Sequence, residues 1–290
     1  MTIRTWIEKN THSLSGKRVA ITGSTGGLGK ELCRHLASLG ADLVLVDRSR
    51  ERSMAHADSL RQIYPDINIT NVTADMEDIS SVKAATETLL QINIDFLILN
   101  AGAYAIPRKK CDTGYDNVFQ INFITPYYMA RRLSASISER GGRIVIVGSI
   151  AHNYSKTDPS DVDFSTRTKA SLVYGNAKRY LSYSLSDLYK DTDILALTHP
   201  GITFTNITAH YPKLIFAVIK YPMKVIFMPP RRAALSILSG IFTPTHKHEW
   251  IGPSLFNVWG LPKKKRLNTA DEEEIKRICE EAEEIFNSIK

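Results

Sequence analysis

The chain has 290 residues and a net charge of +7, and hydrophobic residues make up 43% of it. This composition is typical of a soluble globular protein with a substantial core. The N-terminal residues contain no apolar run of the kind found in a secretory signal, and no uncharged stretch reaches the roughly 18 residues that span a bilayer. The cysteines Cys33, Cys111 and Cys279 lack the spacing of metal or redox motifs, which favours a reducing, cytoplasmic location.

Part of the positive charge lies in the run of basic residues 263–266. A basic patch can bind nucleic acid or an anionic membrane. A solvated surface that attracts a dinucleotide anion explains the same charge. We therefore expect no nucleic-acid partner.

Apolar strands and amphipathic helices alternate along the first two thirds of the chain. We expect strands at 17–22, 41–46, 67–73, 94–99, 143–147 and 194–198, and helices at 28–39, 51–63, 79–91, 115–138 and 171–189. A seventh strand is expected at 249–252, and further helices at 231–241 and 271–289. The alternation predicts a single α/β domain over 1–290, with a doubly wound, seven-stranded parallel sheet and helices on both faces.

A glycine-rich run, Thr22-Gly-Ser-Thr-Gly-Gly-Leu-Gly29, follows the first expected strand and opens the first expected helix. Glycines allow tight turns and a close approach of backbone to a ligand. The helix N-terminus behind them offers free amides to a phosphate. The run therefore predicts a dinucleotide site, which would use Gly23, Ser24, Thr25, Gly27, Leu28 and Gly29.

Two charged residues at the end of the second strand bear on the choice of dinucleotide. Asp47 can accept hydrogen bonds from both hydroxyls of the adenosine ribose and would repel a 2′-phosphate, which favours NAD. Arg48 follows at once and could pair with a 2′-phosphate, so NADP stays possible. The alternative interpretation of Asp47 is a strand-end cap.

Tyr174 and Lys178 lie four residues apart and share one face of an expected helix. A tyrosine with an ordinary pKa of about 10 is a poor base at neutral pH, and a nearby ammonium lowers that pKa. Ser149 ends an apolar strand and could hydrogen-bond a substrate oxygen. Together these residues predict hydride transfer between a nicotinamide and an alcohol or carbonyl, with Tyr174 as general acid/base.

The motifs in this order resemble the short-chain dehydrogenase/reductase family, and within it the retinol-dehydrogenase-like branch. The resemblance covers 16–206, which we take as the cofactor and catalytic core. Its motifs are the glycine run, Asp75, Asn100-Ala-Gly102, Asn122, Ser149, Tyr174-x-x-x-Lys178, and Pro200-Gly201 with Thr205.

The resemblance implies a role for each of these residues. Asp75 and Met76 would contact adenine, and Asn100, Ala101 and Gly102 would line the cleft. Asn122 would hold a helix backbone group and a water in a proton relay, and Lys178 would bind the nicotinamide ribose. The segment that borders the nicotinamide carboxamide would contain Pro200, Gly201, Ile202, Thr203 and Thr205. It also implies a homodimer or homotetramer through the long helices.

The substrate is expected to depend on segments that the family does not fix. A polar insertion lies at 156–163, an apolar helical lid is expected at 207–245, and a basic/acidic tail helix at 263–290. The apolar residues between 202 and 228 suit a hydrophobic secondary alcohol or ketone, such as a steroid, retinoid or long-chain alcohol. Lysines within 211–228 also allow a peripheral membrane contact.

Other functions are weighed against this one. A nicotinamide-binding redox sensor without turnover would share the same cofactor residues. A hydrolase with Ser149 as nucleophile is disfavoured because the Gly-x-Ser-x-Gly pattern is absent. His246 and His248 have no cysteine partner nearby, so no metal is expected.

Overall fold

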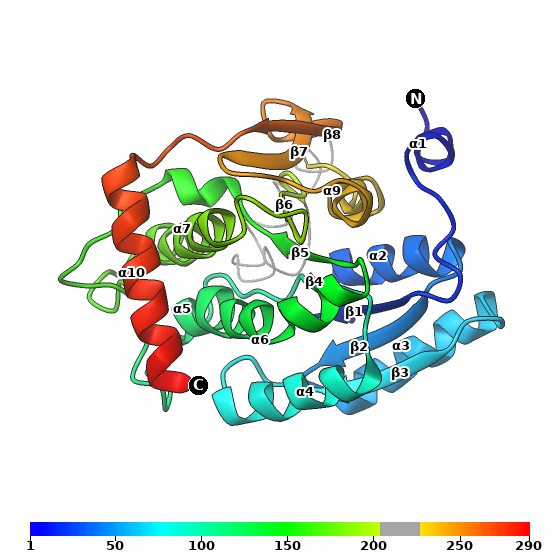
Figure 1. Cartoon of the computed structure of the whole chain (residues 1–290), viewed down its shortest axis with the longest axis horizontal. Coiled ribbons are helices and arrows are strands. Elements are labelled where there is room, and N and C mark those ends of the chain that lie inside the picture. The colour runs from blue at the N-terminus through cyan, green and yellow to red at the C-terminus, as the bar shows by residue number, and fades with distance from the viewer. Residues whose placement is uncertain (204–226) are drawn as a thin grey trace, which may run out of the picture.

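A computed structural model describes residues 1–203 and 227–290. The strands of this structure are β1 (Arg18–Thr22), β2 (Asp42–Asp47), β3 (Ile69–Thr73), β4 (Phe96–Leu99), β5 (Arg143–Val147), β6 (Leu195–Thr198), β7 (Glu249–Leu255) and β8 (Trp259–Arg266). They form one sheet in the order β3-β2-β1-β4-β5-β6-β7-β8 (Figure 1). The predicted doubly wound α/β fold is therefore confirmed.

The seven predicted strands run parallel, but an eighth strand adds to the sheet. β8 pairs antiparallel with β7, and it contains the basic residues 263–266 that were expected to begin the tail helix. Lysines are common on edge strands because they discourage pairing with another chain. The same residues in sequence look like a solvated tail, which is why the strand was missed.

Helices occupy the segments between the strands. They are α1 (Ile3–Asn10), α2 (Gly27–Ser38), α3 (Arg50–Ile63), α4 (Ile79–Ile92), α5 (Asn117–Phe119), α6 (Thr125–Glu139), α7 (Ala170–Leu188), α9 (Pro230–Phe242) and α10 (Glu272–Ile289). A π-helical turn, η1 (Gln120–Ile124), joins α5 to α6, and a 3₁₀ turn, η2 (Ile150–Asn153), follows β5. Most predicted helices are confirmed within a few residues, while α1 was not expected.

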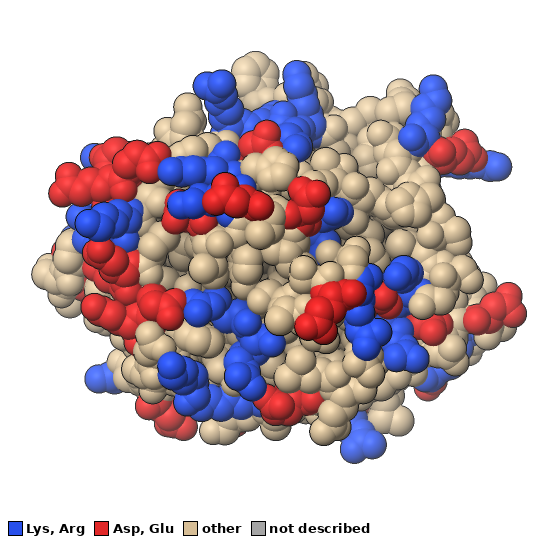
Figure 2. Space-filling view, viewed as in Figure 1, with Lys and Arg blue, Asp and Glu red and all other residues tan. Residues whose placement is uncertain are grey.

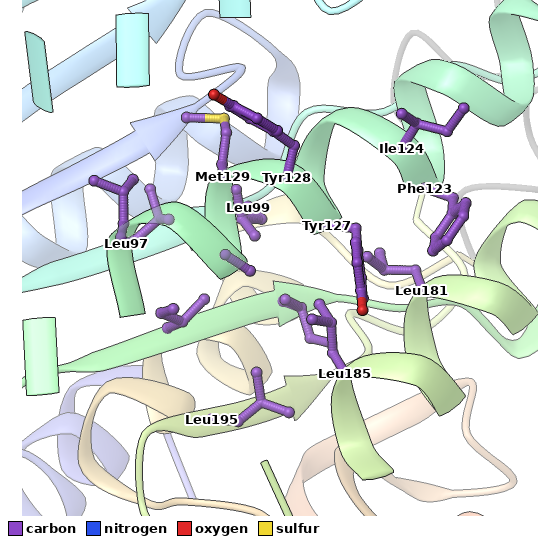
Figure 3. Close-up of a cluster of buried hydrophobic side chains, with 14 of the residues drawn as sticks. Leu97, Leu99, Phe123, Ile124, Tyr127, Tyr128, Met129, Leu181, Leu185 and Leu195 are labelled. Atoms are coloured by element: carbon purple, nitrogen blue, oxygen red, sulfur yellow. The ribbon is translucent and has the colours of Figure 1, made fainter. Parts of the chain in front are cut away.

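The strands bury both faces, so alternate residues belong to two different cores. Ile144 and Ile146 of β5 pack with α4, α6, α7 and α10, whereas Val145 and Val147 pack with α2 and α9. Figure 3 shows the first core, where side chains of β4 and β6 meet those of η1, α6 and α7. The sheet is therefore held rigidly between two helical layers.

The part of the expected lid that the structure describes is a core helix. Residues 230–242 form α9, whose Ala234, Leu235 and Leu238 are buried against the sheet and α2. Of the lid expected at 207–245, residues 230–242 therefore belong to the core. The apolar spacing of α9 is as typical of a core helix as of a lid.

The C-terminal helix α10 covers part of the surface of the long helices (Figure 1). Phe286 packs on the rings of Tyr127 and Tyr128 of α6, and Glu283 pairs with Arg131. A homodimer or homotetramer through the long helices would have to share this surface with α10. The oligomer therefore stays a prediction, and it would need a surface that α10 leaves free.

Charged side chains of both signs are scattered over the face in Figure 2, with several acidic ones on the side where α10 lies and basic ones gathered at the end where β7 and β8 lie. Within the described residues, no helix is long and apolar enough to cross a membrane.

Candidate active site

The predicted site lies where the strand order reverses. β1 is flanked by β2 on one side and by β4 on the other, and the connections run in opposite directions from this point. Ligands of open α/β sheets bind beyond the carboxyl ends of the strands at such a point. The glycine run after β1 and the residues 100–102 after β4 lie on its two sides.

The glycine run forms a cradle that side chains would fill. Gly23 has φ +70° and lies against Ala101, and a Cβ on Gly29 would stand only 2.3 Å from the carbonyl oxygen of Gly23. The N-cap of α2, Gly26, supplies no side-chain hydrogen bond, so the first amides of the helix remain free for a ligand. Backbone packing and free amides together fit the pyrophosphate of a dinucleotide.

Alanine at Gly29 is expected to abolish dinucleotide binding, because its Cβ must displace the loop backbone. Alanine at Gly26 is the matched control, because its Cβ would lie 3.4 Å from the nearest atom at a negative φ. Titration of nicotinamide fluorescence should show at least a tenfold weaker dissociation constant for Gly29→Ala and a change of about twofold or less for Gly26→Ala. Equal affinities of both variants would contradict this account of the loop.

Asp47 lies at the predicted strand end, but its carboxylate is used inside the fold. Its oxygens accept hydrogen bonds from the Ser24 hydroxyl at 2.5 Å, the Thr25 amide and hydroxyl at 3.1 Å, and the Ser53 hydroxyl at 2.9 Å. Four donors match the four lone-pair sites of a carboxylate. Asp47 therefore anchors the glycine loop, as in the strand-end alternative, while Arg48 beside it is exposed.

Residues after β4 hold the loop from the other side. The side-chain amide of Asn100 donates to the carbonyl oxygens of Thr22 and Gly23 at 3.0 and 3.1 Å. The amides of Asn100 and Ala101 donate to the Thr22 hydroxyl at 3.0 Å. The conformation of the loop therefore depends on both strands that flank the reversal.

Asp75 and Met76 follow β3, at the same edge of the sheet. Asp75 accepts from the Glu77 amide at 3.0 Å, and its own amide donates to Ser81. The carbonyl oxygen of Met76 lies 3.4 Å from the Gln120 side-chain amide. Both side chains are half-buried, and their contact with adenine stays a prediction.

Asn122 lies in the π-helical turn η1, and its side chain joins that turn to the loop after β4. Its amide nitrogen donates to the carbonyl oxygens of Ala103 and Val118 at 2.8 Å, and its carbonyl accepts from the Ala103 amide at 3.2 Å. A Cβ on Gly102 would lie 2.8 Å from the Asn122 carbonyl oxygen and 3.7 Å from Lys178 Nζ. π-turns often mark functional positions, and here the turn directs Asn122 toward Lys178.

Ser149, Tyr174 and Lys178 come together as predicted. Ser149 lies close enough to Tyr174 to lower its pKa, and Lys178 Nζ lies 5.7 Å from the Tyr174 ring centroid. Lys178 is almost fully buried and donates to the Val147 carbonyl oxygen at 3.0 Å. Helix α7 therefore presents Tyr174 and Lys178 to the end of β5.

The electrostatics differ from the sequence-based expectation. Burial raises the pKa of Tyr174 to about 12, although the Ser149 hydrogen bond acts in the opposite direction. Burial also lowers the pKa of Lys178 to about 7. The protein alone therefore keeps Tyr174 neutral. A charged Tyr174 or Lys178 needs a further partner next to it.

The segment after β6 is described only in part. Gly201 has φ +82°, and a Cβ there would lie 2.6 Å from the Val258 carbonyl oxygen. The Met228 amide donates to the Ile202 carbonyl oxygen, and Thr203 forms a parallel β-bridge with Met228. Thr205 lies outside the described residues, so its predicted place beside a carboxamide stays a prediction.

Apolar side chains surround one side of Tyr174. Val118, Phe164 and Val173 form a small core against Tyr174 and Ile106. A cavity of about 180 Å³ opens beside them, and its lining includes Ala105, Ile106, Val118 and Val173. A larger cavity of about 780 Å³ lies between the loops 108–116 and 160–168, and no predicted site residue lines it.

Sequence reasoning missed two residues that support the site. Arg179, next to Lys178, forms a buried ion pair with Glu274 of α10. An arginine within an otherwise buried helix face was the available signal, because buried charges are almost always paired. In the part of the chain that the structure covers, no group of three His, Cys, Asp or Glu side chains could hold a metal ion.

Comparison with known proteins agrees with this geometry. The sequence model described as short chain dehydrogenase matches residues 17–158. A curated relative, short-chain dehydrogenase TIC 32 A of Brassica napus, is 29% identical over 70% of this chain and 69% of its own length. Retinol dehydrogenase 12 of Mus musculus is 29% identical over 67% of this chain and 64% of its own length.

Solved structures share the fold. An uncharacterised protein from Mycobacterium paratuberculosis superimposes with a TM-score of 0.74 at 22% identity, and the match covers 95% of each chain. L-sorbose reductase of Gluconobacter frateurii, solved with NADPH, has a TM-score of 0.61 at 20% identity over 80% of this chain and 91% of its own.

The fold, the dinucleotide cradle and these relatives define an NAD(P)-dependent oxidoreductase that acts on CH–OH groups. The chain belongs to the short-chain dehydrogenase/reductase family and is similar to its retinol dehydrogenases.

Proposed function

We propose that this protein interconverts a hydrophobic secondary alcohol and the corresponding ketone, with Tyr174 as general acid/base. The observation that carries the proposal is that Ser149 and Tyr174 lie together at the end of β5, with Lys178 buried 5.7 Å from the Tyr174 ring centroid. A substrate oxygen bound between Ser149 and Tyr174 would accept hydrogen bonds from both hydroxyls.

Each residue of the site has its own role in the proposed reaction. Tyr174 gives a proton to the ketone oxygen or takes one from the alcohol, and Ser149 orients that oxygen. When Lys178 is protonated, its charge, 5.7 Å from the Tyr174 ring centroid, favours the tyrosinate and opposes the effect of burial, which raises the pKa of Tyr174. Asn122 holds the backbone of Ala103 against α5 and η1. A bound nicotinamide would supply the hydride.

A hydrophobic substrate is supported by the surroundings of Tyr174. The small core of Val118, Phe164 and Val173 and the adjoining cavity of about 180 Å³ offer an apolar wall. Apolar pockets with a few polar groups are typical sites for such ligands. The relatives named as retinol dehydrogenases agree with this class of substrate.

The test is the absorbance of reduced nicotinamide with a panel of steroids, retinoids and long-chain alcohols, each with NAD and NADP. Turnover that Tyr174→Phe abolishes supports the proposal. Binding of the dinucleotide without turnover across the panel would favour the redox-sensor alternative instead.

The choice between NAD and NADP is proposed to rest on Arg48. Asp47 already accepts four hydrogen bonds inside the fold, whereas the exposed guanidinium of Arg48 is available to a 2′-phosphate. Arg48 therefore favours binding of NADP over NAD. The negative charge of Asp47 acts in the opposite direction, because it repels a 2′-phosphate.

Two variants separate the contributions of these neighbours. Arg48→Ser should raise the KM for NADP about tenfold and leave the KM for NAD within twofold, because only NADP carries the 2′-phosphate. Asp47→Asn should weaken both dinucleotides together, because it loosens the glycine loop. Improved use of NADP by Asp47→Asn, with no effect of Arg48→Ser, would restore Asp47 as the selecting residue.

Peripheral membrane contact through 211–228 and a cytoplasmic location remain proposals from the sequence. Residues 211–226 lie outside the described residues. Binding to anionic vesicles at low and high salt would test the contact, because an interfacial lysine cluster loses affinity as salt rises.

A further inference from the structure

Arg179 is a buried arginine that the proposed chemistry does not use. Its side chain is only 2% exposed, and it directly follows Lys178 on α7. The guanidinium donates to both carboxylate oxygens of Glu274, at 2.8 and 2.6 Å. It also donates to the carbonyl oxygens of His152 and Thr269, at 2.8 and 2.6 Å. Arg179 therefore joins α7 to three separate segments.

Glu274 brings the C-terminal helix into this junction. It lies in the first turn of α10 and also accepts from the amide and hydroxyl of Thr157, at 2.9 and 3.1 Å. Burial raises the pKa of Glu274, but the hydrogen bonds from Arg179 and Thr157 outweigh burial and hold that pKa below its usual value. The carboxylate is therefore charged at neutral pH and holds the guanidinium in place.

The third segment leads directly to Ser149. His152 lies in the same short turn, η2, that Ser149 caps, and its Nδ1 lies 2.6 Å from the Ser149 carbonyl oxygen. Since a carbonyl only accepts, Nδ1 carries the proton. On the other side of the turn, the Ala151 carbonyl oxygen rests on Gly175, where a Cβ would stand 2.4 Å away. Helix α7 thus contacts the turn η2 at Gly175 and, one helical turn later, at Arg179.

Stability alone does not account for a buried ion pair at this place. A well-packed apolar pair of similar volume often stabilises a protein as well as a buried ion pair does. Leucine and methionine would hold α10 on α7, but neither could also donate to the His152 carbonyl oxygen. The special property of the guanidinium is that one rigid group reaches all three segments.

We propose that the Arg179–Glu274 pair is a positioning device that fixes the Ser149 turn on α7, so that the hydroxyls of Ser149 and Tyr174 meet. Arg179 and Glu274 are positioning residues, and the C-terminal helix thereby becomes part of the support of the active site. The inference rests on the proposed function of Ser149 and Tyr174, and it adds a dependence on α10.

The test replaces the whole pair, so that no buried charge is left alone. The double variant Arg179→Met/Glu274→Leu is compared with Arg131→Met/Glu283→Leu, which removes another ion pair between α10 and the long helices. We expect the first to lower kcat roughly 10- to 100-fold, because small displacements of catalytic groups have effects of that size. The dissociation constant for the dinucleotide should stay within twofold, and the control should keep kcat within twofold.

A pH profile distinguishes positioning from loss of stability. Ser149 lowers the pKa of Tyr174, so displacement of Ser149 should raise that pKa in the Arg179 double variant only. The basic limb of the kcat profile for ketone reduction, or the acidic limb for alcohol oxidation, should then move to higher pH. An unchanged kcat and pH profile would overturn the proposal, as would equal losses in both double variants.

Amide hydrogen exchange provides a readout that does not need turnover. Residues 150–153 should exchange faster in the Arg179 double variant than in the wild type or the control. If the panel of substrates shows no activity, this result still decides whether the pair holds the turn. If the double variant does not fold, Arg179→Lys keeps the buried charge but cannot reach three segments, and the same increase in exchange is expected. Unchanged exchange would overturn the proposal.

Discussion

Tyr174→Phe is expected to lower kcat by roughly 10³- to 10⁴-fold, while the protein folds and binds the dinucleotide as the wild type does. The size follows from the usual contribution of a positioned general acid/base. Phenylalanine keeps the ring contact with Tyr104, whose centroid lies 5.4 Å away, and removes only the hydroxyl. Turnover assays with the best substrate of the panel would measure the fall in kcat.

The matched control for this variant is Tyr183→Phe on the same helix. The Tyr183 hydroxyl accepts from the amides of Thr269 and Ala270, at 2.8 and 3.0 Å, and it is not part of the proposed chemistry. This variant should lose some stability and keep kcat within a fewfold of the wild type. A Tyr174→Phe enzyme with wild-type rates would remove Tyr174 from the mechanism, whatever the control does.

The order of strands and helices could be predicted because it depends on local patterns. Buried parallel strands are continuous apolar runs, as in β5, and glycines mark the turn that leads into α2. The same patterns place Ser149, Tyr174 and Lys178 together, because α7 packs on η2, the turn that follows β5, and Lys178 donates to the Val147 carbonyl oxygen.

What could not be predicted depends on contacts between distant residues. The use of Asp47 follows from the hydroxyls of Ser24 and Ser53, which the strand pattern does not reveal. Glu274 meets Arg179 across 95 residues of sequence, and no spacing rule connects them. The π-turn around Asn122 interrupts a helical pattern that reads as continuous in sequence. In each case the hydrogen-bond partners of a side chain depend on the tertiary structure, and local propensity does not predict them.

The second large effect concerns stability, and it depends on Lys178. Burial lowers the pKa of this ammonium from 10.5 in the unfolded chain to about 7 in the folded protein. Between these two values the unfolded state binds a proton that the folded state lacks, so the free energy of unfolding rises with pH. For one fully coupled proton the slope is about 1.4 kcal/mol per pH unit.

Lys178→Met should remove this slope, because methionine fills similar space and does not titrate. Urea unfolding of the dinucleotide-free protein at several pH values from 7 to 9.5 would give the difference between wild type and variant, in which other titrating groups cancel. The variant is expected to be the more stable protein at neutral pH, and its advantage should shrink steadily toward pH 9.5. Lys169→Met, at the exposed N-cap of the same helix, should run parallel to the wild type.

Saturation with dinucleotide makes the same measurement a test of the site. If Lys178 binds the ribose of the nicotinamide as the resemblance implies, new acceptors favour its charged form and raise its pKa toward the unfolded value. The slope of the wild type should then flatten when the protein is saturated, while Lys178→Met stays unchanged. A slope that persists in the saturated protein would mean that Lys178 does not contact the dinucleotide, and that its burial serves only the approach of α7 to β5.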